Sequence, residues 1–484
     1  MIKLVILLTF ISCYSAFSQV KNIDFTTEEY LQDYDFIVEL IKNQHPNPFR
    51  FISEEQFEKE AHVLREGLKK EPTLANFLLS NPLTLIRDTH SDLNVDDLVF
   101  DAFVKEINFF PLETIVYDQR VFVNQFASDI PLGAEIITVN TKKVTDMLAK
   151  IPAKVDGDIQ GSTQKKFSLY ASLLFPKAEV FTIQYKESVK GSLKSVQLKA
   201  VNYTKYDYNS NKTILPFDLL SYRLGISGYL VNKDTYLISI RSFDLSEAYA
   251  YSILNNLFTS IKDQKVKHII VDIRDNQGGS LSNIPLFYSF ISTEKSFSNI
   301  YKYATKVPKI NVKANLLDEN GKLANANDIL SQDNFMQQRF DKNEEDGFYY
   351  GNNRLDEYYV ENYPQDKNAF TGDVALLINN NTVSAASYFA SLFQLNARGA
   401  LVGQETRSCS GFTTAAWFVN YKLPYTESIV SLPRSEIFFN IAANKDKNCR
   451  GVLPQYTVTA DEFQKGLQKV QDAEMDLALR LLKK

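Results

Sequence analysis

The chain has 484 residues, of which 44% are hydrophobic and 23% are charged. This composition is typical of a globular protein, and the length exceeds what one simple core organises, so two to three domains are expected. A formal net charge of −5 and the lack of a long basic run argue against nucleic-acid binding.

Residues 1–18 predict a secretory signal peptide. Lys3 precedes an apolar run at 4–11, and small residues precede the expected cleavage point after Ser18. The run is too short to span a membrane comfortably, and no other stretch approaches spanning length without charges. We therefore expect an exported protein, periplasmic or extracellular, without a membrane span. Lipidation at Cys13, which follows a poor lipoprotein motif, is the less favoured alternative.

Residues 19–100 predict a helical N-terminal domain. Apolar residues recur at helical spacing from about residue 26 to 79, and the segment His45-Pro46-Asn47-Pro48 predicts a turn between two helices. The domain ends in a polar turn that carries His90.

Residues 101–155 predict a small β-module. Short apolar runs and turn residues precede a predicted helix at 144–151. This layout is similar to a PDZ domain, whose edge groove accepts an extended peptide as an added strand. A generic small β-module is an equally good interpretation of the same pattern.

Residues 156–484 predict an α/β core. Two strongly apolar runs of strand length, at 268–274 and 374–378, each lead into a turn. Strands that alternate with helical patterns indicate a layer with largely parallel pairing. The segment 294–370 is rich in Lys, Asn, Asp and Tyr and lacks regular apolar spacing, which predicts an irregular excursion from the core.

Ser384 follows the second apolar strand, at the first turn of a predicted helix. Unpaired backbone N–H groups and the positive end of the helix dipole favour negative charge at such a position, which suits a serine nucleophile. The alternative interpretation is that Thr382 or Ser384 caps the helix, and this stretch taken alone favours the cap.

Two further features bear on this serine. Gly278 and Gly279 end the first apolar strand, where glycine lets the backbone turn sharply and leaves N–H groups for a substrate oxygen, although a plain turn fits as well. Among four histidines, His90 lies in a polar turn whose hydroxyls or carboxylates can orient an imidazole. Metal-binding and nucleotide-binding motifs are missing, so no metal or cofactor is expected.

Four segments of the chain resemble motifs of the S41 peptidases, the family of C-terminal processing proteases and the tricorn protease core. Segment 272–279 resembles the Asp-Leu-Arg-x-Asn-x-Gly-Gly motif, and segment 382–386 resembles the Thr-x-Ser-Ala-Ala nucleophile turn. Segment 451–455 resembles the closing Gly-Val-x-Pro-Asp motif, and segment 88–91 is similar to the Asp-Gly-His-Thr turn of members that use a histidine.

The resemblance implies a crotonase-like catalytic core behind a helical cap and a PDZ-like module. It further implies Ser384 as the nucleophile, and the backbone N–H groups of Gly279 and Ala385, beside Gly278, as the oxyanion hole. Processing proteases of this family activate the serine with a lysine, whose position is held by Cys409 in this chain. A neutral thiol or a cystine cannot replace a desolvated amine as the base.

The arrangement that remains is the tricorn-like one, in which His90 activates Ser384 and Thr89 supports the histidine. A carboxylate that orients His90 has no clear counterpart in the motifs. The candidates are Glu436, Asp446 and Asp88, and Asn448 stands near the place where an acid is expected.

Cys409 and Cys449 are the cysteines that remain after the expected cleavage. Two thiols in an oxidising compartment predict a disulfide.

The sequence therefore predicts an exported serine endopeptidase that hydrolyses polypeptides through an acyl-enzyme on Ser384, with His90 as general base. The alternative is a non-catalytic binding protein on the same fold, similar to the interphotoreceptor retinoid-binding modules, that holds a peptide or a lipophilic ligand. The sequence does not specify an oligomeric state.

Overall fold

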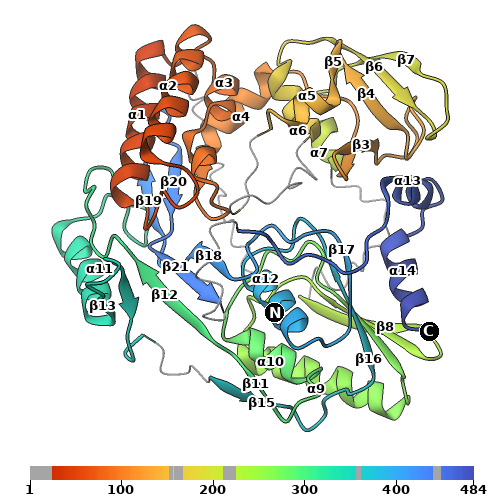
Figure 1. Cartoon of the computed structure of the whole chain (residues 1–484). Coiled ribbons are helices and arrows are strands. Elements are labelled where there is room, and N and C mark those ends of the chain that lie inside the picture. Colours follow the sequence, from red (N-terminus) through yellow and green to blue (C-terminus); the bar gives the residue numbers. More distant parts are fainter. Residues whose placement is uncertain are drawn as a thin grey trace, which may run out of the picture.

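The computed structural model describes residues 24–151, 156, 167–210, 225–355, 361–439 and 449–483. The predicted signal peptide lies outside these residues. Figure 1 shows the N-terminal helices and a small β-module above the core, on opposite sides of the view. None of the helices in the described ranges is both long and apolar enough to cross a membrane.

The core is organised around a five-stranded sheet with the order β17-β16-β10-β9-β8. Its strands are β8 (Ile226–Asn232), β9 (Thr235–Ile240), β10 (His268–Asp272), β16 (Asp373–Ile378) and β17 (Ala400–Gly403). All neighbours pair in parallel except β8, which is antiparallel to β9. Strands buried on both faces need continuous apolar runs, and β10 and β16 have them. The predicted α/β fold class is confirmed.

Helices cover both faces of this sheet (Figure 1). They are α9 (Glu247–Asp263), α10 (Asn283–Ser289) and α12 (Ala385–Leu395) on one face and α14 (Ala473–Leu481) on the other. Successive strand residues point to opposite faces, so Ile269 and Val271 pack with the first three helices while Ile270 packs with α14. Because β10 and β16 are parallel neighbours, the turns that follow them meet at one edge of the sheet.

An antiparallel sheet with the order β13-β14-β12-β21-β18 flanks the core. Its strands are β12 (Tyr301–Thr305), β13 (Phe340–Lys342), β14 (Tyr349–Gly351), β18 (Phe412–Ala415) and β21 (Ser435–Phe439). The segment 294–370 is therefore more ordered than its sequence pattern indicates, since it also contains α11 (Ala326–Arg339) and the paired strands β11 (Ser296–Ser298) and β15 (Asn362–Pro364). These strands are short and depend on distant partners such as β21, so they leave little periodic signal.

The N-terminal helices dock onto the second half of the chain. They are α1 (Thr27–Gln44), α2 (Glu54–Lys70), α3 (Leu74–Leu79), the 3₁₀ helix η1 (Pro82–Ile86) and α4 (Asp97–Glu106). They share one hydrophobic cluster with the strands β19 (Val419–Lys422) and β20 (Ile429–Leu432). The short strand β1 (Asp92–Asn94) pairs antiparallel with β20. This pairing fixes the turn containing His90, which immediately precedes β1, against the core.

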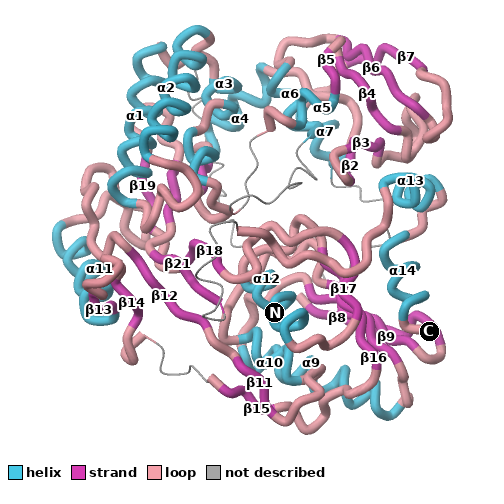
Figure 2. The backbone as a smooth tube through the Cα atoms, viewed as in Figure 1, coloured by secondary structure: helices cyan, strands magenta, loops and turns pink. Residues whose placement is uncertain are grey.

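The small β-module is larger than the sequence indicates. Its strands are β2 (Thr114–Tyr117), β3 (Arg120–Val123), β4 (Glu135–Val139), β5 (Lys142–Lys143), β6 (Val180–Lys186) and β7 (Lys194–Lys199), accompanied by α5 (Val144–Leu148), α6 (Phe167–Leu174) and α7 (Tyr203–Ser210). The sheet order β2-β3-β4-β6-β7 carries the module past the expected boundary at residue 155. Phe181 and Ile183 of β6 are buried in the same cluster as β3 and β4. Figure 2 shows these strands as one group, close to α13 (Ala460–Gln468).

A disulfide joins Cys409 to Cys449. The two Cα atoms are 5.6 Å apart, within the range that a disulfide requires. The bond closes a loop with a sequence separation of 40 residues, which contains β18 to β21. It therefore restrains the segment on which the N-terminal helices dock.

Phe389 tests how far the core depends on α12. Its side chain is 1% exposed inside the main hydrophobic cluster, so we expect Phe389→Ala to lower the free energy of unfolding by about 3–5 kcal/mol. Leu395 lies on the same helix with 61% exposure, and Leu395→Ala is expected to change it by less than about 0.5 kcal/mol. Thermal melts of both variants check this, and equal melting temperatures would contradict the assigned packing.

Alkylation with mass measurement checks the disulfide. We expect no labelling of Cys409 or Cys449 without reductant and labelling of both after reduction. Removing the bond by Cys409→Ser with Cys449→Ser should lower the free energy of unfolding by about 2–4 kcal/mol, because the unfolded chain regains loop entropy. Labelling of both thiols before reduction would show that the pair is open.

Candidate active site

Ser384 has an unusual backbone at the N-terminus of α12. It is the N-cap residue with φ 58° and ψ −127°, and its side chain makes no capping hydrogen bond. The hydroxyl of Thr382 donates to the carbonyl of Ile273 at 3.1 Å and so is directed to the neighbouring turn. Positive φ is rare and strained for a residue with a side chain, and such strain gathers at functional sites. Helix capping therefore does not explain the choice of serine at position 384.

The Gly278-Gly279 turn packs directly against Ser384. A Cβ atom added to Gly278 would lie 2.8 Å from the Cβ atom of Ser384 and 3.0 Å from the backbone nitrogen of Ala385. Both glycines have positive φ, 99° and 138°, and a Cβ on Gly279 would collide with the backbone of Asp244. The turn requires glycine at both positions for close approach as well as for conformation.

The backbone N–H groups near Ser384 differ in their hydrogen-bond partners. The N–H of Gly278 donates to Asn276 Oδ1 at 2.8 Å, which holds the turn, and leaves Gly279 as the candidate donor to a substrate oxygen. Ala385 occupies the first position of α12, where a backbone N–H has no acceptor within the helix. Gly279 and Ala385 thus remain the candidate oxyanion donors of the expected set, and Gly278 serves the turn itself.

The charged residues of the segment 272–279 support the strand end. Arg274 is buried and its guanidinium contacts Asp272 at 2.9 Å, Asp472 at 2.7 Å and Glu474 at 3.0 Å. Burial disfavours an ionised Asp272, but the charges of Arg274 and Arg241 and the hydrogen bonds from Arg274 together outweigh burial and lower the pKa of Asp272 well below its usual range. These ion pairs fix β10 to α14 just before the glycine turn.

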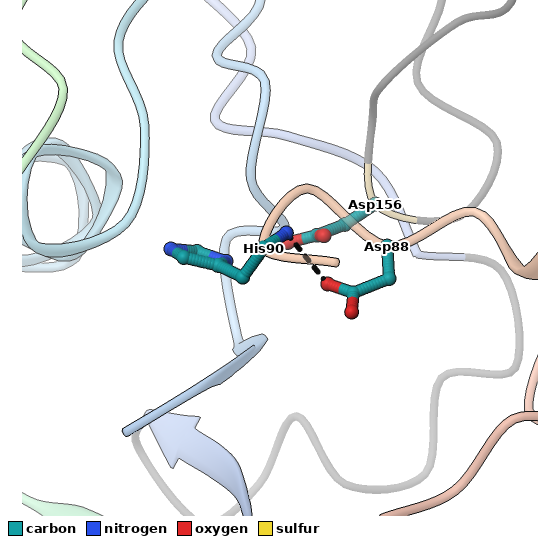
Figure 3. Close-up of side chains that lie close together, drawn as sticks. All are labelled: Asp88, His90 and Asp156. Carbon is teal, nitrogen blue, oxygen red and sulfur yellow. Dashed lines mark hydrogen bonds between the residues drawn. The ribbon is translucent and has the colours of Figure 1, made fainter. Parts of the chain in front are cut away.

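His90 lies in a turn of hydrogen-bonded polar groups. Its backbone N–H donates to Asp88 Oδ1 at 2.9 Å, and Figure 3 shows the imidazole ring extending away from this carboxylate. The ring atom Nδ1 lies 2.9 Å from the hydroxyl of Thr89 and 3.4 Å from that of Thr413. Both hydroxyls in turn donate to Asp156, at 2.8 Å and 3.1 Å.

This network selects one form of the neutral imidazole. Because each threonine hydroxyl gives its proton to Asp156, its oxygen can accept a proton from Nδ1 of His90. The hydrogen bonds thus assign the proton to Nδ1 and leave Nε2 as the basic nitrogen. Figure 3 shows Asp156 and Asp88 approaching the histidine from different segments.

Asp156 is the carboxylate that the sequence did not indicate. It also accepts the backbone N–H of Thr89 at 2.9 Å. Burial, and then the negative charge of Asp88, raise the pKa of Asp156 to about 7. Asp88 is buried too, which raises its pKa, but its hydrogen bonds to His45 at 3.0 Å and to Ser91, together with the charge interactions with His45 and His90, outweigh burial and lower the pKa of Asp88. A single Asp that belongs to no recognised motif and to no periodic apolar pattern gives no signal by which it could have been found.

The three acids expected near His90 are placed differently. Glu436 accepts from Arg50 at 2.6 and 2.7 Å and from Asn47 at 3.1 Å, so its described partners do not include the histidine. Asp88 contacts the backbone of His90, and Asp446 lies outside the described residues. The carboxylate linked to the ring through hydroxyls is Asp156 instead.

Asp88, His90 and Asp156 also bring potential metal-binding atoms within 4.8 Å of one another. Both oxygens of Asp156 already accept hydrogen bonds from threonine hydroxyls, and both oxygens of Asp88 accept from His90, His45 or Ser91. Donors that already contact both oxygens of each carboxylate suit a hydrogen-bond network, and we assign no metal to the cluster.

Ser408 connects the serine and histidine turns. Its Oγ accepts the backbone N–H of Ser384 at 2.9 Å and lies 3.5 Å from the hydroxyl of Thr89. Residues from three distant segments, around positions 90, 156 and 384, therefore meet at the carboxyl edge of the parallel sheet. The N-terminal turn and the glycine turn are the two segments that the sequence motifs placed beside Ser384.

Known structures and families agree with this architecture. The structure of mature CPAF complexed with lactacystin has a TM-score of 0.56 at 15% identity, covering 94% of this chain and 98% of that chain. A serine-to-alanine mutant of CPAF has a TM-score of 0.59 at 14% identity, with the same coverage. At this identity the likeness shows the fold. No curated protein matches this chain. Residues 234–458 match the model of Peptidase family S41, so this part of the chain belongs to that family, and the protein is a serine-type peptidase.

Proposed function

We propose that the chain is an exported serine endopeptidase with Ser384 as its nucleophile and His90 as its general base. The observation that supports this most is the backbone of Ser384, which is strained at φ 58°, lacks a capping bond and lies against the glycine turn. A hydroxyl held on a strained strand-to-helix turn is the arrangement by which α/β hydrolases expose a nucleophile.

In the proposed reaction, Oγ of Ser384 attacks the carbonyl carbon of the scissile peptide bond while Nε2 of His90 takes the hydroxyl proton. The N–H groups of Gly279 and Ala385 bind the oxyanion, and each such donor is typically worth about 10²–10³ in rate. His90 then protonates the leaving amine, and the carbonyl carbon stays bonded to Ser384 as an acyl-enzyme. A water molecule, deprotonated by His90, releases the product.

Asp156 supports His90 through the hydroxyl of Thr89 in this mechanism. An ionised Asp156 orients the hydroxyls of Thr89 and Thr413 so that both oxygens face Nδ1 of the ring. The same carboxylate stabilises the positive charge that the ring acquires when it takes the serine proton. The disulfide between Cys409 and Cys449 supports the export part of the proposal, because such bonds persist in oxidising compartments.

A fluorophosphonate probe and casein digestion test the nucleophile and the base together. We expect the probe to label the wild type and not Ser384→Ala, and casein hydrolysis to fall by about 10²-fold or more in His90→Ala. Ser289→Ala, which removes a buried hydroxyl that donates to the carbonyl of Leu286, is the matched control and should label normally. Equal labelling of the wild type and Ser384→Ala would contradict the assignment.

The pH profile tests Asp156. Because burial raises the pKa of Asp156 to about 7, kcat/KM should rise with pH through about 6–8 as the Asp156 carboxyl loses its proton. Asp156→Asn should lower kcat by about 10²-fold or more, and the part of the rise in kcat/KM that comes from the Asp156 carboxyl should be missing from its pH profile. The pKa of Asp156 in the folded protein exceeds its unfolded value, so the stability that its protonated form contributes should be lost as pH rises from about 4 through 7.

Asp33→Asn is the control for the pH experiment. Burial also raises the pKa of Asp33, whose carboxylate accepts the backbone N–H groups of Tyr425 and Thr426 in the docked helical region. Its replacement should change stability and leave the pH profile of kcat/KM as in the wild type. A wild-type profile that is retained in Asp156→Asn would remove Asp156 from the mechanism.

A further inference from the structure

We propose that Ser408 is a positioning residue that holds the nucleophile turn and the histidine turn in register for the reaction. This inference rests on the proposed function of Ser384 and His90. Ser408 stands next to Cys409, the position at which processing proteases of the S41 family carry their lysine, and its hydroxyl makes contacts on both sides of the site.

The Ser408 hydroxyl is placed between the two turns. The side chain is 0% exposed, and its Oγ accepts the N–H of Ser384 at 2.9 Å. The same Oγ lies 3.5 Å from the hydroxyl of Thr89, which lies 2.9 Å from Nδ1 of His90. One buried oxygen thus contacts the backbone of the nucleophile and the hydroxyl that neighbours the base.

The direction of these hydrogen bonds can be assigned. Thr89 gives its own proton to Asp156 at 2.8 Å, so in the pair with Ser408 the proton belongs to Ser408. A hydroxyl has one proton and two lone pairs, and this count is met at both oxygens. The result is a chain of hydrogen bonds that runs from the N–H of Ser384 through Ser408 and Thr89 to Asp156.

This chain matters because Ser384 is strained. Its N–H lies at a half-buried helix terminus, and a buried N–H without an acceptor is strongly disfavoured. The bond to Ser408 satisfies this N–H and holds the peptide between Val383 and Ser384 in one orientation, and the strained Ser384 side chain extends from that peptide. Loss of the acceptor would let the residue relax and move Oγ relative to His90.

The turn that carries Ser408 is itself firmly held. The N–H of Arg407 donates to the carbonyl of Thr382 at 2.9 Å, and the carbonyl of Arg407 accepts the N–H of Asp156 at 3.2 Å. The hydroxyl of Thr406 donates to the carbonyl of Ser408 at 2.9 Å, and the disulfide follows at Cys409. The turn therefore binds the backbones of the nucleophile and carboxylate segments at once.

Ser408→Ala and Ser408→Thr test the inference, with Ser289→Ala as the buried-serine control. We expect Ser408→Ala to lower kcat for peptide hydrolysis and the fluorophosphonate labelling rate by about 10²-fold, with KM changed less than about threefold. The pH at which kcat/KM is half maximal should shift as well, because the link to Asp156 is altered. Ser408→Thr keeps the hydroxyl and should recover at least tenfold of the lost kcat.

Thermal melts of each variant identify any loss of fold. Thr89→Val removes the next hydroxyl of the hydrogen-bond chain and provides a second test. Its effect on kcat should be non-additive with that of Ser408→Ala. A folded Ser408→Ala with kcat within twofold of Ser289→Ala would overturn the inference, as would additive effects of the two substitutions. A wild type that is not labelled at Ser384 would instead contradict the proposed function.

Discussion

The backbone of Ser384 is the constraint on which the site depends. An L-residue holds φ 58° only when its surroundings require it, and three contacts do so in this protein. The Cα of Gly278 packs against the serine, Ser408 accepts its N–H, and the preceding N–H of Val383 donates to the carbonyl of Asn276 at 3.0 Å. The parallel pairing of β10 and β16 brings these contacts together. The fold of the sheet therefore maintains the strained backbone of Ser384.

Buried polar groups around the histidine turn are stabilised by one another. Asp88 and Asp156 are both removed from water, which would be strongly unfavourable for isolated carboxylates. His45 contacts the first and two threonine hydroxyls contact the second, so that their oxygens are satisfied by hydrogen bonds. A network of this kind has few alternative arrangements, and it orients the imidazole through the hydroxyls of Thr89 and Thr413.

The sequence predicted the parts of the site that have a local signal. Continuous apolar runs identified β10 and β16, and the motif order pointed to Ser384 and the glycine turn. Asp156 carried no signal, because its importance arises from tertiary packing against Thr89 and Thr413 alone. The strands within 294–370 were missed because their burial depends on distant partners, and the module boundary was placed early because β6 pairs back to β4 across an intervening segment.

The pairing of β1 with β20 also sets the order in which the enzyme can become active. Chains are made from the N-terminus, and domains tend to fold as they emerge. The turn of His90 has its docking partner only once β20 exists, since Leu93 pairs with Val430. By then the serine turn has already been synthesised. The proposed base and nucleophile therefore meet late in biosynthesis, when nearly the whole chain is available, and a partly made chain has no assembled site with which to cleave its neighbours.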